Sequence, residues 1–357
     1  MKKLIYICAA LAVVACSKSE VAYEGNGGEL ALSPVSYLST KGAITSNVYP
    51  EENHIALFAY HNPGQTATDN VTDYSVFASN QYLNDTEFWY NTSSPTDKVG
   101  TKAWSGLNSI YYWPITGSLV FAGYSLPAPE EGQKNSPSIG TASYDLVNDV
   151  LEIDGYTQSA NTASTFDLLY FGRDGKSYNN RRDGIAVPVQ FSHALAWITI
   201  NVKGGEGALV ENHVWKITEM TLKDVNTKGD FTFNGTPEGE EKPVAWDLTA
   251  DAAPMTVFDA EGGKNLTDGF VTIENETAGT VVIPQAPKQL SVTLTYKSPA
   301  NDDITETFDI DLSLGEGVIW EAGKHYVYNL TFSPVEIKVA PEVTVWPSPG
   351  VTTNIER

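Results

Sequence analysis

The sequence predicts an all-β protein made of two antiparallel β-sandwich domains. Apolar and β-branched runs of about four to eight residues recur along the chain and are bounded by Gly, Pro, Asn and Asp, a pattern typical of strands and tight turns. No stretch of about twelve or more residues has a clear 3.6-residue apolar period, so we expect few and short helices. At roughly 100–200 residues per domain, the 357-residue chain suggests two domains, and sandwiches are the natural packing for many short strands.

The first half of the chain contains several strand candidates separated by polar loops. They lie at residues 54–60, 87–90, 118–124, 150–153 and 167–171. The first of these is apolar almost throughout, which predicts a buried strand. Residues 127–143 are rich in Pro, Gly and Ser and are expected to form a long loop.

A polar segment at residues 174–183 precedes the expected boundary between the two domains. We therefore expect an N-terminal domain over residues 42–186 and a C-terminal domain over residues 187–357. Residues 197–202 alternate between apolar and polar with period two, as a half-buried strand should. Further strand candidates lie at residues 215–222, 229–233, 280–284, 290–296, 306–312 and 324–332.

The C-terminal tail, residues 335–346, is expected to form two short strands. Val335, Ile337 and Val339 alternate with charged residues, and Val343 and Val345 follow a break at Pro341. Prolines between strands are confined to sheet edges and bends. The tail is therefore expected at an edge, where it either completes the sheet of the C-terminal domain or pairs with something outside it.

The first sixteen residues have the features of an export signal. Two lysines precede an apolar segment at residues 4–15, which is too short for a bilayer span of roughly 20 residues. Val14-Ala15-Cys16 resembles the lipobox of bacterial lipoproteins, which predicts lipidation of Cys16 and attachment to the outer membrane. The alternative is an ordinary secretory signal that happens to contain a cysteine. Because both cysteines lie in this segment, no disulfide is expected in the remainder of the chain.

The formal net charge of −22 and the pI near 4.5 exclude some classes of partner. A chain this acidic is repelled by nucleic acids and by anionic lipid surfaces. The acidic residues are spread along the sequence, which favours a solvated surface over a dedicated acidic site.

No motif predicts a catalytic centre, a metal site or a cofactor site. The five histidines are scattered without metal-ligand spacing. Residues 123–127 lack the second glycine of a nucleophile elbow. Residues 224–230 only faintly resemble a calcium loop, because Lys228 occupies a position that needs an oxygen ligand and no glutamate closes the loop. A hydrolase with paired carboxylates stays open as a minor hypothesis, because carboxylate separation is a three-dimensional quantity.

Aromatic clusters give the main alternative to a structural role. Trp89 and Trp113 could form a platform that stacks on sugar rings, which would make the protein a surface lipoprotein that binds glycans. Aromatic residues also fill the cores of β-sandwiches, and we favour that interpretation.

Several short segments, taken in order, resemble the fimbrillins of Bacteroidetes, the subunits of type V pili. The segments are the lipobox at Cys16, Ser39-Thr40-Lys41-Gly42-Ala43-Ile44, Ile55 to Tyr60, Tyr112-Trp113-Pro114 before Leu119 to Tyr124, Phe191 to Ala196, Trp320-Glu321-Ala322-Gly323-Lys324-His325-Tyr326-Val327-Tyr328-Asn329-Leu330, and Trp346. The resemblance implies two transthyretin-like β-sandwich domains and a lipoprotein precursor that reaches the cell surface. It also implies a protease that removes the first strand and a neighbouring subunit whose strand replaces it.

Lys41 is the expected cleavage point. It is the only basic residue between Lys18 and Lys98, and no arginine precedes Arg173, so a trypsin-like protease finds one obvious bond, Lys41–Gly42. The cut would release residues 17–41, including an expected first strand at residues 30–38. Pro34 in this strand cannot donate to a ladder, which predicts an edge strand. The alternative is an exposed lysine in a linker.

The C-terminal tail is our candidate for the strand that replaces the first one. A vacated edge exposes unpaired backbone groups and apolar surface, and the five β-branched residues Val335, Ile337, Val339, Val343 and Val345 could cover it. The expected partners are thus other pilus subunits, the outer membrane and a processing protease, and the expected role is structural and adhesive.

Overall fold

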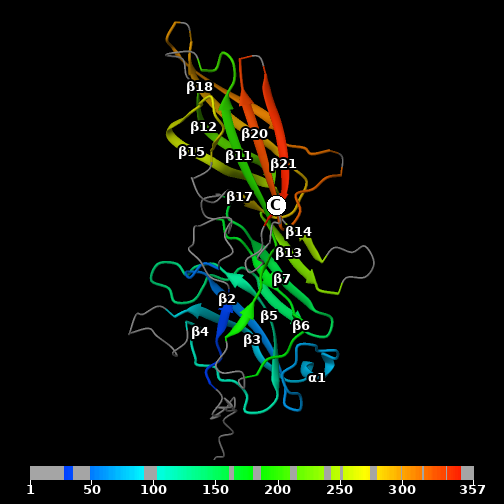
Figure 1. Cartoon of the computed structure of the whole chain (residues 1–357). Coiled ribbons are helices and arrows are strands. Elements are labelled where there is room, and N and C mark those ends of the chain that lie inside the picture. The colour runs from blue at the N-terminus through cyan, green and yellow to red at the C-terminus, as the bar shows by residue number, and fades with distance from the viewer. Residues whose placement is uncertain are drawn as a thin grey trace, which may run out of the picture.

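The computed structural model describes residues 28–34, 49–91, 103–160, 165–179, 186–209, 215–236, 243–249, 252–273, 280–298, 300–315, 317–334 and 336–346. Within these residues the chain forms 21 strands and one four-residue helix, α1 (Ser75–Ala78). The all-β class predicted from the sequence is confirmed. No helix of the described part is long and apolar enough to cross a membrane. The strands form two bodies that lie one above the other (Figure 1).

The lower body is built on an eight-stranded sheet that curls until its edges approach each other. Its order is β10 (Ser192–His193), β8 (Leu169–Phe171), β5 (Ser118–Leu126), β2 (His54–Asn62), β3 (Gln81–Tyr90), β4 (Trp104–Gly106), β1 (Leu32–Pro34) and β9 (Val187–Val189). The edge strands β9 and β10 are separated by only two residues of chain. Successive Cα atoms are 3.8 Å apart, so Val189 and Ser192 lie within about 11 Å of each other. The sheet is therefore nearly closed.

One hydrophobic core fills the concave side of this sheet, and a second covers its outer face. Ile55 and Leu57 of β2 belong to the inner core, whereas Ala56 and Phe58 of the same strand belong to the outer one. Successive side chains of a strand point to opposite faces, so β2 and β5 are buried on both sides. This explains why residues 54–60 are apolar without alternation.

A four-stranded sheet covers the outer face of β2 and β5. Its order is β14 (Val244–Leu248), β13 (Lys228–Asn234), β7 (Val150–Thr157) and β6 (Thr141–Asp145). The hairpin β13–β14 comes from the second half of the chain and extends a hairpin from the first half. Strand pairing thus crosses the boundary expected at residues 186/187, because β9, β10 and this hairpin all complete sheets of the lower body.

The upper body is a two-layer sandwich. One sheet contains β16 (Val271–Thr272), β11 (Ala196–Gly204), β20 (Lys324–Phe332) and β21 (Ile337–Val345), with β17 (Thr280–Val282) also paired to β11. The facing sheet contains β15 (Ala253–Asn265), β12 (Lys216–Val225), β18 (Gln289–Lys297) and β19 (Asp303–Asp311). A core from both sheets lies between them. Two pairings depart from the expected antiparallel pattern: β11 with β20, and β1 with β9, are parallel.

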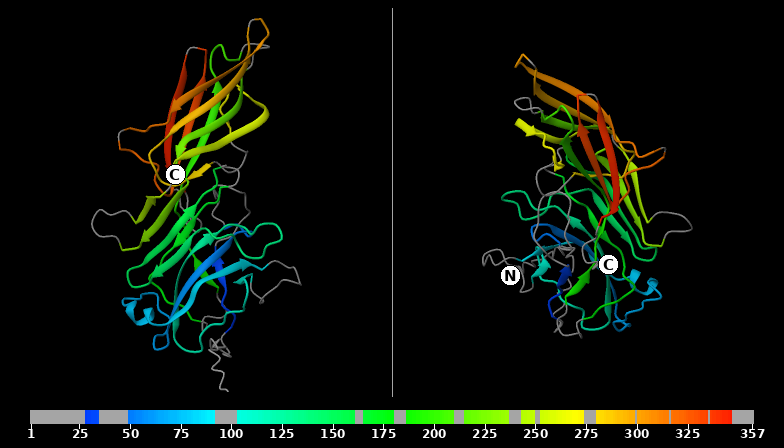
Figure 2. Two further views of the ribbon diagram at one scale, coloured as in Figure 1. Left: turned by 180° about the vertical axis from the view of Figure 1, so that it is seen from behind. Right: turned by 45° about the horizontal axis from the view of Figure 1, so that its top comes forward.

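Four aromatic rings connect the two bodies. His193 of β10 stacks on Trp346, with ring centroids 3.6 Å apart. Trp197 of β11 stacks on His325 of β20 at 3.4 Å and also contacts Trp346 at 5.6 Å. His193 Nδ1 lies 3.0 Å from Asp167 Oδ2, and both side chains are fully buried. Seen from the front and from behind, β21 runs down to this junction (Figures 1 and 2).

Substitution of Phe231 tests whether β13 contributes to the core of the lower body. It is fully buried against Tyr170 and Trp246, with ring centroids 5.3 and 5.2 Å away. We expect Phe231→Ala to lower the free energy of unfolding by about 3–5 kcal/mol, because it removes a core ring and leaves a cavity. Urea denaturation measures this change. Phe270→Ala, at an aromatic residue that is 46% exposed, should change stability by less than about 1 kcal/mol; equal losses would refute the assignment.

His325 should make the fold sensitive to mild acid. Burial lowers the pKa of His325 from 6.5 to about 4, so the unfolded chain binds a proton at pH values where the folded chain does not. The stability that neutral His325 contributes is therefore complete above about pH 6.5 and is lost as the pH falls from 6.5 toward 4. We expect His325→Gln to lose less unfolding free energy than the natural chain when urea denaturation is repeated at pH 5 instead of pH 7. The same loss in the natural chain and in His325→Gln would contradict the prediction.

Candidate functional site

Strand β1 lies inside the curled sheet, and the expectation of an edge strand at residues 30–38 is wrong. Leu32 pairs with Trp104 of β4 on one side, and all three β1 residues pair in parallel with β9 on the other. Pro34 occupies the last position of a three-residue ladder. Pro34 pairs with Val189 of β9 and has no partner in β4, so one of its sides is unpaired even though β1 is not an edge strand.

The segment 28–34 is an integral part of the inner core. Leu30 is fully buried and Leu32 is 3% exposed. Leu30 N donates to Tyr111 O at 2.7 Å, and Trp113 N donates to Gly28 O at 3.0 Å. Val187 N donates to Ala31 O at 2.8 Å on the opposite flank. The segment therefore joins β9 to β4 and to the loop at Tyr111–Trp113. We call the gap between β4 and β9 that it fills the seam of the sheet.

Several residues of the expected assembly site lie outside the described residues. They are Cys16, Lys41, Gly42 and Val335. The described segment 28–34 ends seven residues before Lys41, and the chain is described again from Tyr49, which is fully buried in the inner core.

The tail forms one strand instead of the two short strands predicted. β21 pairs antiparallel with β20 over nine residues, and Pro341 lies opposite Tyr328 in the middle of this ladder. β21 is the edge of its sheet. A proline interrupts an edge strand less than a central one, because its missing N–H can lie on the unpaired side. The expected edge position of the tail is thus correct, although the break at Pro341 is not.

The apolar side chains of β21 share one face but differ in exposure. Ile337, Val339 and Val343 lie opposite Phe332, Leu330 and Tyr326 of β20. Ile337 and Val339 pack against the core of the upper body. Val343 is 52% exposed and Val345 is 70% exposed. One half of this apolar row is therefore covered by its own subunit, and the other half faces solvent.

Trp346 follows this exposed end of β21 and is itself only 1% exposed. Its ring stacks on His193, and its backbone N–H donates to Gly323 O at 2.9 Å. The sequence indicated Trp346 only through the family resemblance, since its ring partners His193 and Trp197 come from segments more than 100 residues away.

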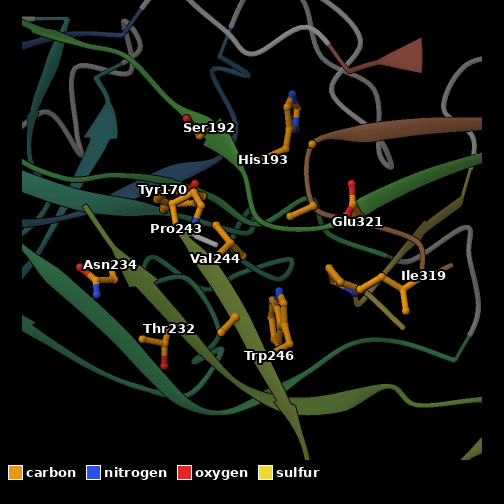
Figure 3. A pocket seen from close by; sticks show the side chains of 14 residues that line it. Tyr170, Ser192, His193, Thr232, Asn234, Pro243, Val244, Trp246, Ile319 and Glu321 are labelled. Atoms are coloured by element: carbon orange, nitrogen blue, oxygen red, sulfur yellow. The ribbon is translucent and has the colours of Figure 1, made fainter. Parts of the chain in front are cut away.

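A pocket of about 770 Å³ lies between the two bodies next to this junction (Figure 3). Its lining includes Tyr170, His193, Trp246 and Glu321. The indole N–H of Trp246 donates a hydrogen bond to Ala194 O at 2.9 Å. The described residues contain no group of three His, Cys, Asp or Glu side chains that could hold a metal ion. Sequence analysis missed this pocket because its walls come from six separate segments of the chain.

The aromatic platform considered for glycans is not formed as expected. Trp113 is 2% exposed and packs edge-on against Phe121, with centroids 6.1 Å apart. Trp89 is half-buried. A ring enclosed in the core cannot stack on a sugar, so Trp113 belongs to the packing of the lower body.

Comparisons with known proteins agree with this architecture. A family model described as fimbrillin-like matches residues 40–346, and no curated protein sequence matches the chain. The fold is similar to that of a fimbrial protein from Bacteroides vulgatus, with a TM-score of 0.51 and 15% identity over 89% of this chain and 99% of that one. Weaker similarity links it to a protein from Bacteroides uniformis provisionally named for cell adhesion, with a TM-score of 0.47 and 15% identity over 90% of this chain and 100% of that one. The tip fimbrial protein Mfa3 from Porphyromonas gingivalis has a TM-score of 0.35 and 8% identity, over 89% of this chain and 99% of that one. Because the family model spans most of its length, the chain belongs to the fimbrillin-like family.

Proposed function

We propose that the chain is a structural subunit of an adhesive surface fimbria that assembles by strand exchange. In this proposal it is exported as an outer-membrane lipoprotein through Cys16, and a trypsin-like protease cuts the Lys41–Gly42 bond. The observation that carries the proposal is the position of segment 28–34, which is buried in the core although it precedes the proposed cut. A cut at Lys41 would detach both the lipid and this segment.

Loss of segment 28–34 would leave an apolar seam that needs a replacement. Trp104, Trp113 and Val187, each at most 3% exposed now, line the segment or bond to it. The amide of Val187 and the carbonyl of Tyr111 would lose their partners. Exposed strand edges of this kind bind any strand with suitable alternation, so the cleaved subunit is an acceptor.

The tail is suited to be the donor because its own sheet covers only half of its apolar face. Val343 and Val345 are 52% and 70% exposed. Burying an exposed valine contributes up to roughly 1.5–3 kcal/mol, so each of these two would gain about 1–2 kcal/mol in a neighbour's seam. Val335, Ile337 and Val339 supply the other half of the alternating row. The exchange would thus cover the part of the apolar row that faces solvent in the free subunit.

Cleavage at Lys41 should convert a monomer into a series of oligomers. We expect the exported protein, treated with a lysine-specific endoprotease, to form regularly spaced larger species on size-exclusion chromatography, because the opened seam takes the tail of the next subunit. Lys41→Ala should stay monomeric under the same treatment. Lys41→Arg should resist this protease and assemble after an arginine-specific cut. Complete cleavage at Lys41 with a lasting monomer would reject the strand-exchange proposal.

The apolar face of the tail should matter more than its charge. We expect the double substitution Val343→Asp with Val345→Asp to reduce assembly of the cleaved protein at least about 10-fold, because two carboxylates would have to enter an apolar seam. The matched control is Ala340→Asp with Thr344→Asp, which places the same charges on the solvent face of the same strand. Size-exclusion profiles of the two cleaved proteins measure the difference. Equal assembly would show that Val343 and Val345 are not donor residues.

A further inference from the structure

We propose that Trp346 is a latch that keeps β21 in the subunit's own sheet until assembly. Its ring occupies a socket formed by His193 and Trp197, and the tail becomes available to another subunit only when the ring leaves this socket. The latch rests on the proposed donor role of the tail, because it regulates the same strand.

The burial of Trp346 contrasts with the strand that it ends. Trp346 is 1% exposed, whereas every β21 residue from Ala340 to Val345 is exposed. The ring lies 3.6 Å from His193 at an interplanar angle of 17°, and 5.6 Å from Trp197. A buried tryptophan removes more apolar area from water than any other side chain. The end of an otherwise solvated strand is therefore held by one large side chain.

The rest of β21 is weakly attached. It pairs on one side only, and Ile337 and Val339 at its beginning are its half-buried residues. Its ion pair, Lys338 with Glu336, is exposed at both ends, and such pairs contribute little to stability. Besides the backbone ladder with β20, the half after Pro341 has an exposed hydrogen bond from Asn329 Nδ2 to Glu342 Oε1 at 3.1 Å, so the buried side-chain anchors lie at the start of the strand and at Trp346. Release of the ring frees the half that carries Val343 and Val345.

The residues of the socket have contacts of their own besides Trp346. Asp167 holds His193 at 3.0 Å, and His325 stacks on Trp197 at 3.4 Å with an interplanar angle of 7°. His193 also borders the pocket of about 770 Å³ between the two bodies (Figure 3). The partners of the ring are thus held by contacts of their own, so withdrawal of Trp346 does not require either body to unfold.

Hydrogen–deuterium exchange of the uncleaved full chain tests the latch directly. We expect Trp346→Ala to accelerate amide exchange in residues 342–345 at least about 10-fold, because local opening of an edge strand sets its exchange rate. Amides of β12 and β18 in the facing sheet should exchange at the natural rate. Trp346→Phe should restore part of the protection, since a smaller ring can still stack, and Val345→Ala should leave exchange unchanged. Unaltered exchange in residues 342–345, or acceleration throughout the upper body, would overturn the latch.

Assembly kinetics separate the latch from the proposed function. After cleavage at Lys41, Trp346→Ala should form oligomers about 10-fold faster than the natural protein if release of the ring limits the rate. If the natural cleaved protein never assembles while exchange in Trp346→Ala is accelerated, the latch stands and the strand-exchange proposal fails. If the natural protein assembles and Trp346→Ala changes neither exchange nor rate, the latch fails and strand exchange stands.

Discussion

The near-closure of the eight-stranded sheet is the constraint on which the lower body depends. The chain passes from β9 at one edge to β10 at the other through two residues, Gln190 and Phe191. Phe191 is 1% exposed and stacks on Tyr49 at 4.8 Å, so the crossing is itself part of the inner core. The gap between β4 and β9 is closed by β1, a strand of three residues. A short strand in this position has consequences far beyond its own contacts, because it joins β9 to β4 and seals the core against water.

Trp346, at the other end of the described chain, also links parts of the structure beyond its own strand. Trp346 belongs to the outer core of the lower body, although β21 belongs to the upper sandwich. The rings of Trp346, His193 and Trp197 thus do two things at once: they fix the last strand, and they connect the two bodies. Aromatic pairs contribute about 0.5–1.5 kcal/mol beyond the area they bury, so the junction is firm without an ion-pair network. Loosening the tail therefore also loosens a contact between the bodies.

Local patterns in the sequence predicted where many strands lie, but they did not predict which strands pair with each other. Residues 197–202 and 324–332 alternate as the structure requires, and both are found as strands, β11 and β20. β15 is not among the strands predicted from the sequence. Gly262 and Gly263 within it have positive φ and lie in the register shift between Ile217 and Glu219 of β12, so they form an irregularity within one long strand. Pro34 led us to expect an edge strand because a proline lacks a backbone N–H. That missing N–H does not determine how many strands lie beside the proline. The pairing of β13 with β7, about 75 residues away, leaves no trace in composition or periodicity. The seam and the aromatic socket are products of such non-local pairings, which is why the sequence predicted the participating segments and not their arrangement.

The lengths of the strands limit how the proposed exchange can work. β1 pairs through three residues, whereas β21 pairs through nine, which at about 3.3 Å per residue is roughly 30 Å against 10 Å. The seam between β4 and β9 can therefore accept only part of the tail. Pro341 divides the apolar row into Val335, Ile337 and Val339 before it and Val343 and Val345 after it, and either part matches the two or three inward positions that Leu30, Leu32 and Pro34 occupy. Ile337 and Val339 of the first part pack against the core of their own subunit, whereas Val343 and Val345 of the second part face solvent. Exchange that begins at the second part costs the donor no core contact except that of Trp346, so the arrangement of exposure along β21 favours opening from its C-terminal end.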